Sequence, residues 1–217
     1  MTTPSNLVLW FTFSMAMMAI WIGAAALTPA QAQSVDAFRA GETIDCPGCD
    51  LQGISFPEAK LAGANLAGAN LTGATLIGAD LTGATLAGAD LTGANLAGAV
   101  LEGANLERAI FDGGNFQGAE FTDAVIARAS FAEADVRGAI LVRANLHRAN
   151  MPGANLDGAD LSVASLNVAN LRGAILSNTL LSYADFFLAD LTGANLTDAY
   201  MWRGNTRRAR MQNVDIS

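Results

Sequence analysis

The fold is decided by residues 59–83, AKLAGANLAGANLTGATLIGADLTG, in which one five-residue unit repeats without interruption. From Leu51 to Ile216, every fifth residue is Leu, Phe, Ile, Val or Met, with Thr206 as the one exception. Two places before each of these, from Ala59 to Ala174, the residue is Ala except at Gly114. A short period kept over most of a chain predicts a repeat architecture.

A five-residue period excludes both a long α-helix and a long strand. In a helix, residues five apart are rotated by about 140°, so no apolar stripe forms, and in a strand they point to opposite faces. In Ala64-Asn65-Leu66, alternation instead places Ala64 and Leu66 on one face, and Ala67-Gly68 then turns the chain. Each unit is therefore predicted to be a very short strand and a corner, in a coil that buries Ala and Leu.

The unit Ala-Asp/Asn-Leu-x-Gly, present at residues 69–73, 79–83 and 154–158, resembles that of the pentapeptide-repeat protein family. The resemblance implies an all-β fold, a right-handed quadrilateral β-helix with four units in each coil. Residues one coil apart would then stack at about 4.8 Å, and residues 51 to 216 would form a rod on the order of 40 Å long.

The N-terminal segment has the character of a leader. The first 32 residues carry no charged side chain, and residues 7–27 form an apolar run. Ala30-x-Ala32 matches a secretory cleavage site, which predicts export with cleavage before Gln33. No Lys or Arg precedes the run, and its 21 residues suffice to span a bilayer. A hydrophobic helix that anchors the chain in the inner membrane is therefore the alternative to a soluble periplasmic or thylakoid-lumenal protein.

Four segments are expected along the chain. Residues 1–32 are the signal peptide or membrane anchor, and residues 33–50 are an N-terminal cap that contains a C-x-x-C motif. Residues 51–204 are the β-helix, and residues 205–217 are a degenerate last coil or a C-terminal cap. Caps are expected because the open end of a solenoid exposes strand edges and interior. In the first cap, Ser34 is predicted to start a short helix.

Cys46-Pro47-Gly48-Cys49 holds the only two cysteines. A C-x-x-C motif can exchange disulfides, but no thioredoxin-like βαβ pattern surrounds this one, and two cysteines do not complete a zinc site. Cys49 also occupies the small inward position that Ala holds elsewhere. In an exported protein, a structural disulfide across the first corner is preferred to thiol–disulfide exchange.

Stacking at one coil per step places Arg108, Arg128 and Arg148 in a like-charged column, called here the arginine ladder. Like charges directly opposite each other are destabilising. The ladder is therefore either neutralised by Glu107 and Glu133 or available to bind an anion, and local neutralisation is the commoner case.

The same stacking predicts three further contacts. Asp123 and Arg143 are expected to form an ion pair, as are Arg137 and Asp157. Phe111 is expected to stack on Phe131 inside the coil.

The last third of the repeat carries apolar and aromatic residues at outward positions, with an arginine beside them. This set, called here the aromatic patch, consists of Leu180, Tyr183, Phe187, Leu188, Tyr200, Trp202 and Arg203. Its composition is that of an interface, and it predicts a protein partner or self-association. The alternative is that residues 205–217 fold back and cover it.

No catalytic constellation is found, because an interior filled with Ala and Leu leaves no cleft. His147, the only histidine, has no second metal ligand in register, so neither a cofactor nor a metal is expected. The net charge of −8 argues against nucleic-acid binding. The leading hypothesis is an exported, non-enzymatic scaffold or protein-interaction module, and an accessory subunit of a membrane complex if the leader is retained. The family resemblance implies one further alternative, a topoisomerase-binding DNA mimic.

Overall fold

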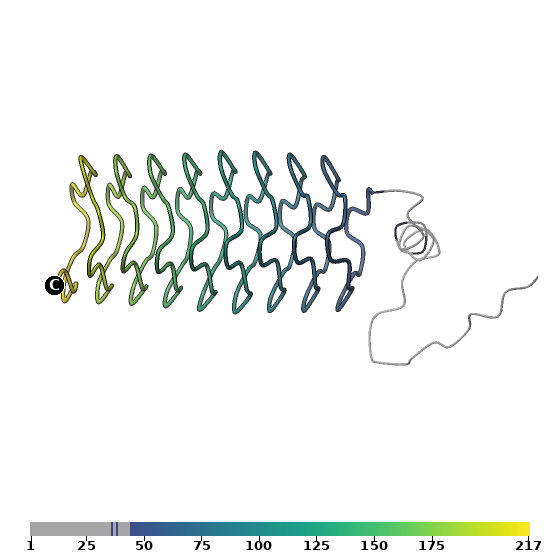
Figure 1. The fold of residues 1–217 in the computed structure, drawn as a ribbon, viewed down its shortest axis with the longest axis horizontal. Helices are drawn as coiled ribbons and strands as arrows, with labels where there is room; N and C mark the ends of the chain where they lie inside the picture. The colour runs from purple at the N-terminus through teal and green to yellow at the C-terminus, as the bar shows by residue number, and fades with distance from the viewer. Residues whose placement is uncertain (1–35, 37, 39–43) are drawn as a thin grey trace, which may run out of the picture.

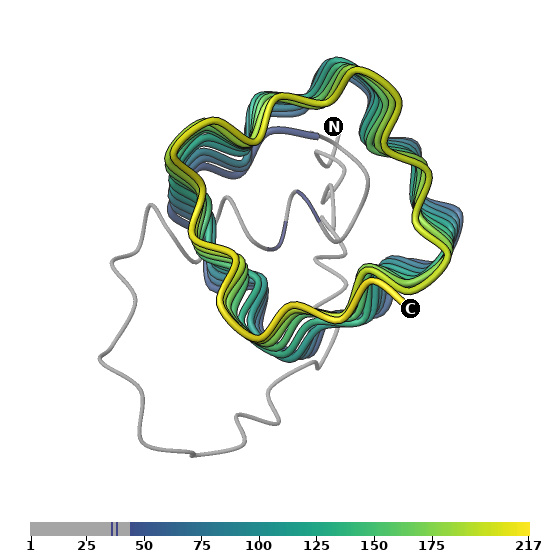
Figure 2. The same cartoon turned by 90° about the vertical axis from the view of Figure 1, so that its left-hand side faces the viewer.

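The chain forms a β-helix solenoid, in a computed structural model that describes residues 36, 38 and 44–217 (Figure 1). Each coil takes 20 residues, since every β-bridge joins a residue to the one 20 positions later, from Asp50↔Asn70 to Asn195↔Asp215. The bridges are parallel, and each strand is a single bridge residue long. Viewed along the axis, the coils superpose in a four-sided outline (Figure 2).

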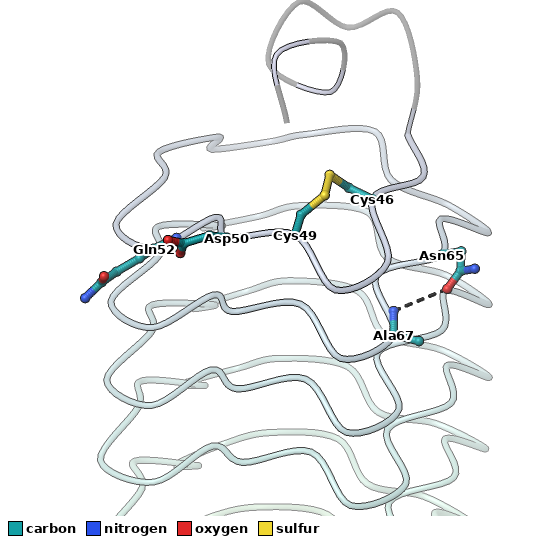
Figure 3. The surroundings of a disulfide bond; sticks show 6 residues. All are labelled: Cys46, Cys49, Asp50, Gln52, Asn65 and Ala67. Carbon is teal, nitrogen blue, oxygen red and sulfur yellow. Dashed lines mark hydrogen bonds between the residues drawn. A yellow bond between two sulfur atoms is a disulfide. The ribbon is translucent and has the colours of Figure 1, made fainter. Parts of the chain in front are cut away.

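The corners are four-residue turns whose chemistry explains the repeated unit. The Ala69 N–H donates to the Leu66 carbonyl at 3.1 Å, and Gly68, the third residue of this turn, has a φ of 65°. A left-handed third residue defines a type II turn and favours Gly. The side-chain oxygen of Asn65 accepts a hydrogen bond from the Ala67 N–H at 3.2 Å (Figure 3). Asn or Asp before the central Leu therefore stabilises the turn, and Gly after it avoids strain.

Successive coils are joined by backbone hydrogen bonds along all four sides. The Leu66 N–H donates to the Thr85 carbonyl at 2.8 Å, and the Gly68 N–H donates to the Ala87 carbonyl at 2.9 Å. The Thr85 N–H in turn donates to the Ala64 carbonyl at 2.8 Å. Because the neighbouring coils satisfy these polar groups, the side chains inside the coil can be almost entirely apolar.

The interior consists of stacked Ala and Leu side chains, with a cluster of phenylalanines in the middle of the rod. Phe111, Phe116, Phe121 and Phe131 are fully buried at 0% exposure. The rings of Phe111 and Phe131 are stacked, with centroids 4.5 Å apart and an interplanar angle of 24°. This contact confirms the stacking of these two rings predicted from the sequence.

At the N-terminal end, the helical residue Phe38 covers the first coil. Its side chain is only 6% exposed, and its ring lies edge-on to that of Phe56, with centroids 5.7 Å apart. The regular turns begin at Cys46, within the segment expected to form the cap. Residues 1–32, expected to be a signal peptide or membrane anchor, and Ser34, expected to start the cap helix, lie outside the described residues.

At the C-terminal end, residues 205–217 continue the coil and do not fold back over its sides. Asp185↔Asn205 and Asp190↔Arg210 are bridges of the regular pattern. Met211 and Ile216, in the inward register, are 39% and 76% exposed because no described coil follows them. The aromatic patch is therefore not covered by this segment.

Replacing Phe38 by Ala is expected to loosen the first coil. Loss of the buried ring should lower the local opening free energy near residues 46–61 by about 2 kcal/mol, which makes amide hydrogen exchange there about 30-fold faster. Hydrogen exchange followed by mass spectrometry measures this. Phe38→Leu, which keeps most of the apolar volume, serves as the control, and unchanged exchange in Phe38→Ala would contradict a capping role.

Candidate interaction surface

In the described part of the chain, His, Cys, Asp and Glu side chains do not gather as metal ligands would. No group of three or more His, Cys, Asp and Glu side chains in it is placed to hold a metal ion. His147 is half-buried on an outer side, and its backbone N–H donates to the Asn145 side-chain oxygen at 3.1 Å. No helix among the described residues has the length and apolar character needed to cross a bilayer. The candidate functional residues therefore lie on the outer sides of the coil.

Cys46 and Cys49 are joined by a disulfide across the first turn (Figure 3). Pro47 and Gly48, with a φ of 67° at Gly48, occupy the middle of this turn, which is the arrangement that a type II turn favours. The two cysteines take the inward places of Leu and Ala and are 0% and 1% exposed. Their burial shields both sulfur atoms from a disulfide substrate, which weighs against thiol–disulfide exchange.

The aromatic patch is exposed near the C-terminal end, on two neighbouring corners and, through Leu180 and Tyr200, on the side that leads into the first of them. Leu180, Tyr183, Leu188, Tyr200 and Trp202 are between 45% and 58% exposed, whereas Phe187 is half-buried. Monomeric proteins rarely expose apolar groups of this size side by side.

The patch residues contact one another from coil to coil. The Trp202 ring lies edge-on to that of Tyr183, with centroids 5.0 Å apart. The Arg203 guanidinium lies 4.6 Å from the Trp202 ring centroid, and that of Arg208 lies 6.0 Å from the Phe187 ring. Two aromatic side chains thus each carry a cation over the ring, a contact that orders both partners.

The arginine ladder is only partly neutralised. Glu107 lies 3.8 Å from the Nε of Arg108 and 3.5 Å from Nη1 of Arg128. Within the described residues, Arg148 takes part in no ion pair, and neither does Glu133. Glu133 was expected to contribute, but it lies on a different corner, beside Gly153. One carboxylate therefore serves two of the three ladder arginines.

The predicted pair of Asp123 and Arg143 is confirmed. The Arg143 guanidinium donates two hydrogen bonds to the Asp123 carboxylate, at 2.7 and 2.6 Å, from one coil to the next. The hydrogen bond from Arg143 holds the pKa of Asp123 below its ordinary value. Stacking alone was sufficient to predict this contact.

The predicted contact between Arg137 and Asp157 does not form, and the two charges attract each other only at longer range. Arg137 instead donates to the Asp135 carboxylate, from Nε at 2.8 Å and from Nη2 at 2.7 Å. Asp157 accepts hydrogen bonds from Ser177 and Asn178, at 2.6 and 2.8 Å. The outward residues on either side of one inward residue are neighbours, so Arg137 reaches Asp135 within its own unit.

These carboxylates should make the rod sensitive to acid. Hydrogen bonding from Arg137 lowers the pKa of Asp135 to about 2 from its usual 3.8. A depressed folded-state pKa means that the stabilisation is present above pH 4 and is lost as the pH falls toward 2. We expect thermal stability to change little between pH 7 and 5 and to fall below about pH 4.

Asp135→Asn should lower the stability at pH 7 by about 1 kcal/mol, once the exposure of the pair to solvent is allowed for, and reduce the loss in acid. Thermal unfolding at pH 7, 5 and 3 tests both effects. Glu133→Gln, which breaks no ion pair of the described structure, is the control. An acid loss equal in the Asp135→Asn variant and the parent would exclude this pair as a cause.

The ladder and the aromatic patch belong to one continuous surface. Steps of one coil lead along a single corner, called here corner A, through Arg108, Arg128, Arg148, Val168, Leu188 and Arg208. The neighbouring corner, called here corner B, carries Asp123, Arg143, Val163, Tyr183 and Arg203. The two valines, 51% exposed at position 163 and 40% at position 168, extend the patch beyond the residues chosen from the sequence. A β-branched residue in the position of the turn glycine is the signal that would have revealed them.

Comparison with protein families matches a model described as pentapeptide repeats, in 8 copies, to residues 49–88, 89–126, 129–167, 164–203 and 189–217. A comparison with curated proteins found no match.

Among solved structures, the chain is similar to HetL, a pentapeptide repeat protein involved in heterocyst differentiation regulation from the cyanobacterium Nostoc sp. strain PCC 7120. The identity is 26%, the match covers 83% of this chain and 94% of HetL, and the TM-score is 0.52. A trypsin-treated form of QnrB1, a plasmid-mediated fluoroquinolone resistance protein, matches at 18% identity over 79% of this chain and 85% of its own, with a TM-score of 0.42. A pentapeptide repeat protein of the Arabidopsis thaliana thylakoid lumen matches at 23% identity over 74% and 71%, with a TM-score of 0.23.

The family model covers nearly all of the coil, and its units coincide with the turns and bridges described above. The chain belongs to the pentapeptide repeat family.

Proposed function

We propose that this protein is a non-enzymatic scaffold that binds a protein partner, or a second copy of itself, through the aromatic patch. The observation that carries the proposal is the exposure of Tyr183, Tyr200 and Trp202 on one end of the rod, with Arg203 over the Trp202 ring. Trp, Tyr and Arg are the residues that most often dominate binding energy at interfaces.

The coil presents this patch with little freedom to rearrange. The Tyr183 N–H donates to the Trp202 carbonyl at 2.9 Å, and Leu180 and Tyr200 form a bridge between coils. Side chains held on a hydrogen-bonded backbone lose less entropy on binding than those on a flexible loop. Such a surface suits a partner that docks without reshaping it.

We further propose that the protein is exported and that residues 1–32 are a signal peptide or a retained anchor, the hydrophobic helix expected before a right-handed coil. The Cys46–Cys49 disulfide supports an oxidising compartment. Sequencing the N-terminus of the native protein tests this: Gln33 in a soluble fraction supports cleavage. Met1 or Thr2 in the membrane fraction supports an anchored accessory subunit.

A photo-crosslinking residue at Tyr200, introduced in the native host, tests the interaction. We expect a discrete protein adduct that disappears when Trp202 and Phe187 are both replaced by Ala. The same crosslinker at Glu120, which is exposed on the same column nearer the N-terminus, is the control. An adduct no stronger at Tyr200 than at Glu120, together with a monomeric parent protein, would overturn the proposal.

The DNA-mimic alternative requires a continuous acidic face. In the column that carries Asp50, Asp90 and Asp190, neutral residues such as Asn70 and Ile110 intervene. This interruption favours the scaffold over the mimic. A supercoiling assay separates them, since inhibition of gyrase by micromolar protein would support the mimic.

A further inference from the structure

Some turns carry a side chain other than that of glycine at their third residue, where the backbone is strained. The third residue of each turn has a positive φ, and in the described structure 18 of these residues are Gly and 16 are not. An L-residue in the left-handed region costs roughly 1–2 kcal/mol, and the cost is highest for β-branched residues such as Val163 and Val168, both with φ of 63°. The turn backbone thus favours Gly at this position, yet 16 of these turns carry another residue there.

The strained positions are concentrated on one side of the rod. Eleven of the 16 lie on corners A and B between Arg108 and Arg208. Of the other five, three are Asn or Asp, which tolerate the left-handed region. Local strain of this kind clusters at functional sites, so the side bounded by the two corners, called here the A–B side, is a candidate binding surface.

Charge is also concentrated on the A–B side. Of the 11 basic residues that the structure describes, seven lie on it, namely Arg108, Arg128, Arg143, Arg148, Arg203, Arg207 and Arg208. From residue 107 to residue 208, three acidic residues lie there, namely Glu107, Asp123 and Asp185, and Asp45 and Glu102 lie on the same side nearer the N-terminus. A basic side on a protein of net charge −8 is complementary to an acidic partner.

Along the rod axis, the apolar residues of this side lie between two groups of arginines. The arginine ladder precedes Val163, Val168, Tyr183 and Leu188, and Arg203, Arg207 and Arg208 follow them. A hollow adjoins corner A on the side facing away from corner B, lined by Val168 and Leu188 together with the cations Arg172, Arg208 and Arg210 and with Asp190. From Arg108 to Arg208 the corner runs for five coil steps, about 24 Å.

We propose that the A–B side binds an extended, acidic protein segment. Its carboxylates face the arginine ladder, and its apolar or aromatic residues pack against the apolar stretch from Val163 to Leu188. An extended segment of about eight residues matches this length. The inference rests on the proposed scaffold function and adds the chemistry of the partner.

The probe is a fluorescein-labelled peptide of four glutamates followed by Leu-Phe-Leu-Phe, titrated with the full chain in mild detergent and followed by fluorescence anisotropy. We expect micromolar affinity, about 10-fold weaker binding when the glutamates are replaced by glutamines, and a loss of affinity with added salt. Peptide binding that is absent up to about 1 mM protein would overturn the proposal.

Variants locate the binding on the A–B side. Arg128→Glu with Arg148→Glu should weaken binding at least 10-fold, whereas Lys60→Glu with Arg137→Glu, an equal change in charge outside this side, should leave it within about twofold. Val163→Gly with Val168→Gly should weaken it about threefold without loss of folding. Equal effects of the two charge-reversal pairs would overturn the location.

Two competing probes decide the class of partner. A labelled DNA duplex and vesicles containing 30% phosphatidylserine are titrated under the same conditions, and tighter binding of either through the ladder arginines would overturn a protein partner. If the Tyr200 crosslinks persist while the acidic peptide fails to bind, the scaffold function stands and this inference falls. If no Tyr200 crosslinks form, both the scaffold function and this inference fail.

Discussion

Gly114→Ala is expected to destabilise the rod by about 2 kcal/mol, although Ala fills this inward position in every other unit from Ala59 to Ala174. A Cβ at Gly114 would lie 2.6 Å from Cε2 of Phe116 and 3.0 Å from the carbonyl oxygen of Ala94. The φ of Gly114 is not in the left-handed region, so the effect comes from crowding alone.

The Phe116 ring cannot move away from this clash. Its centroid lies 5.2 Å from that of Phe111, 6.2 Å from that of Phe121 and 5.8 Å from that of Phe131. Extra volume in a close-packed core forces side chains off their rotamers and shifts the backbone.

Chemical denaturation of Gly114→Ala, Phe116→Leu and the double variant measures the coupling. Phe116→Leu alone should cost about 1 kcal/mol through the space it leaves, and in the Gly114→Ala background it should restore most of the lost stability. The loss of stability in the double variant is then smaller than the sum of the two single losses. If the two losses of stability simply add in the double variant, the absence of a Cβ at Gly114 is not what makes room for the Phe116 ring.

Replacing Val163 and Val168 together by Gly is expected to stabilise the rod by about 2 kcal/mol in total. Both side chains are on the surface, at 51% and 40% exposure, so little packing is lost. Relief of the left-handed strain outweighs the greater entropy of glycine in the unfolded chain. Deleting two surface side chains should therefore raise the melting temperature.

Gly158→Val tests the reverse substitution, in which valine replaces a turn glycine. Gly158 has a φ of 68°, and nothing lies within 4 Å of a Cβ placed on it, so valine there meets strain and no clash. A loss of about 1–2 kcal/mol is expected. Asp198→Gly, at an exposed aspartate with φ of 56°, should change stability little. Lower stability in the double glycine variant would show that the valines make contacts that outweigh their strain.

The sequence is sufficient to predict the coil because the rules that form it are local. Each unit contains its own turn, with Asn65 or its equivalent accepting a hydrogen bond from the backbone N–H two residues later and Gly68 in the left-handed position. Stacking by whole coils then follows from the unbroken register. The contact of Phe111 with Phe131 and the pair of Asp123 with Arg143 were predictable for the same reason.

Contacts between neighbouring outward positions were harder to predict. The sequence offers Arg137 two aspartates, one in its own unit and one on the next coil, and side-chain reach selects Asp135. Glu133 is near the ladder in sequence but lies on another corner. Such choices depend on the direction and length of side chains, which a repeat pattern does not encode.

The period, the inward stacks of Ala and Leu and the glycine of each turn follow from the chain alone, since they arise within a few residues. The continuation of the arginine ladder into the part of the aromatic patch around Leu188 appears only when coils are stacked in space, with Arg148, Val168 and Leu188 on one corner. The strain at Val163 and Val168 can likewise be recognised only from the backbone φ angles of the folded chain. These surface properties join residues that are a full coil apart in sequence, and the hydrogen bonds between coils bring them together.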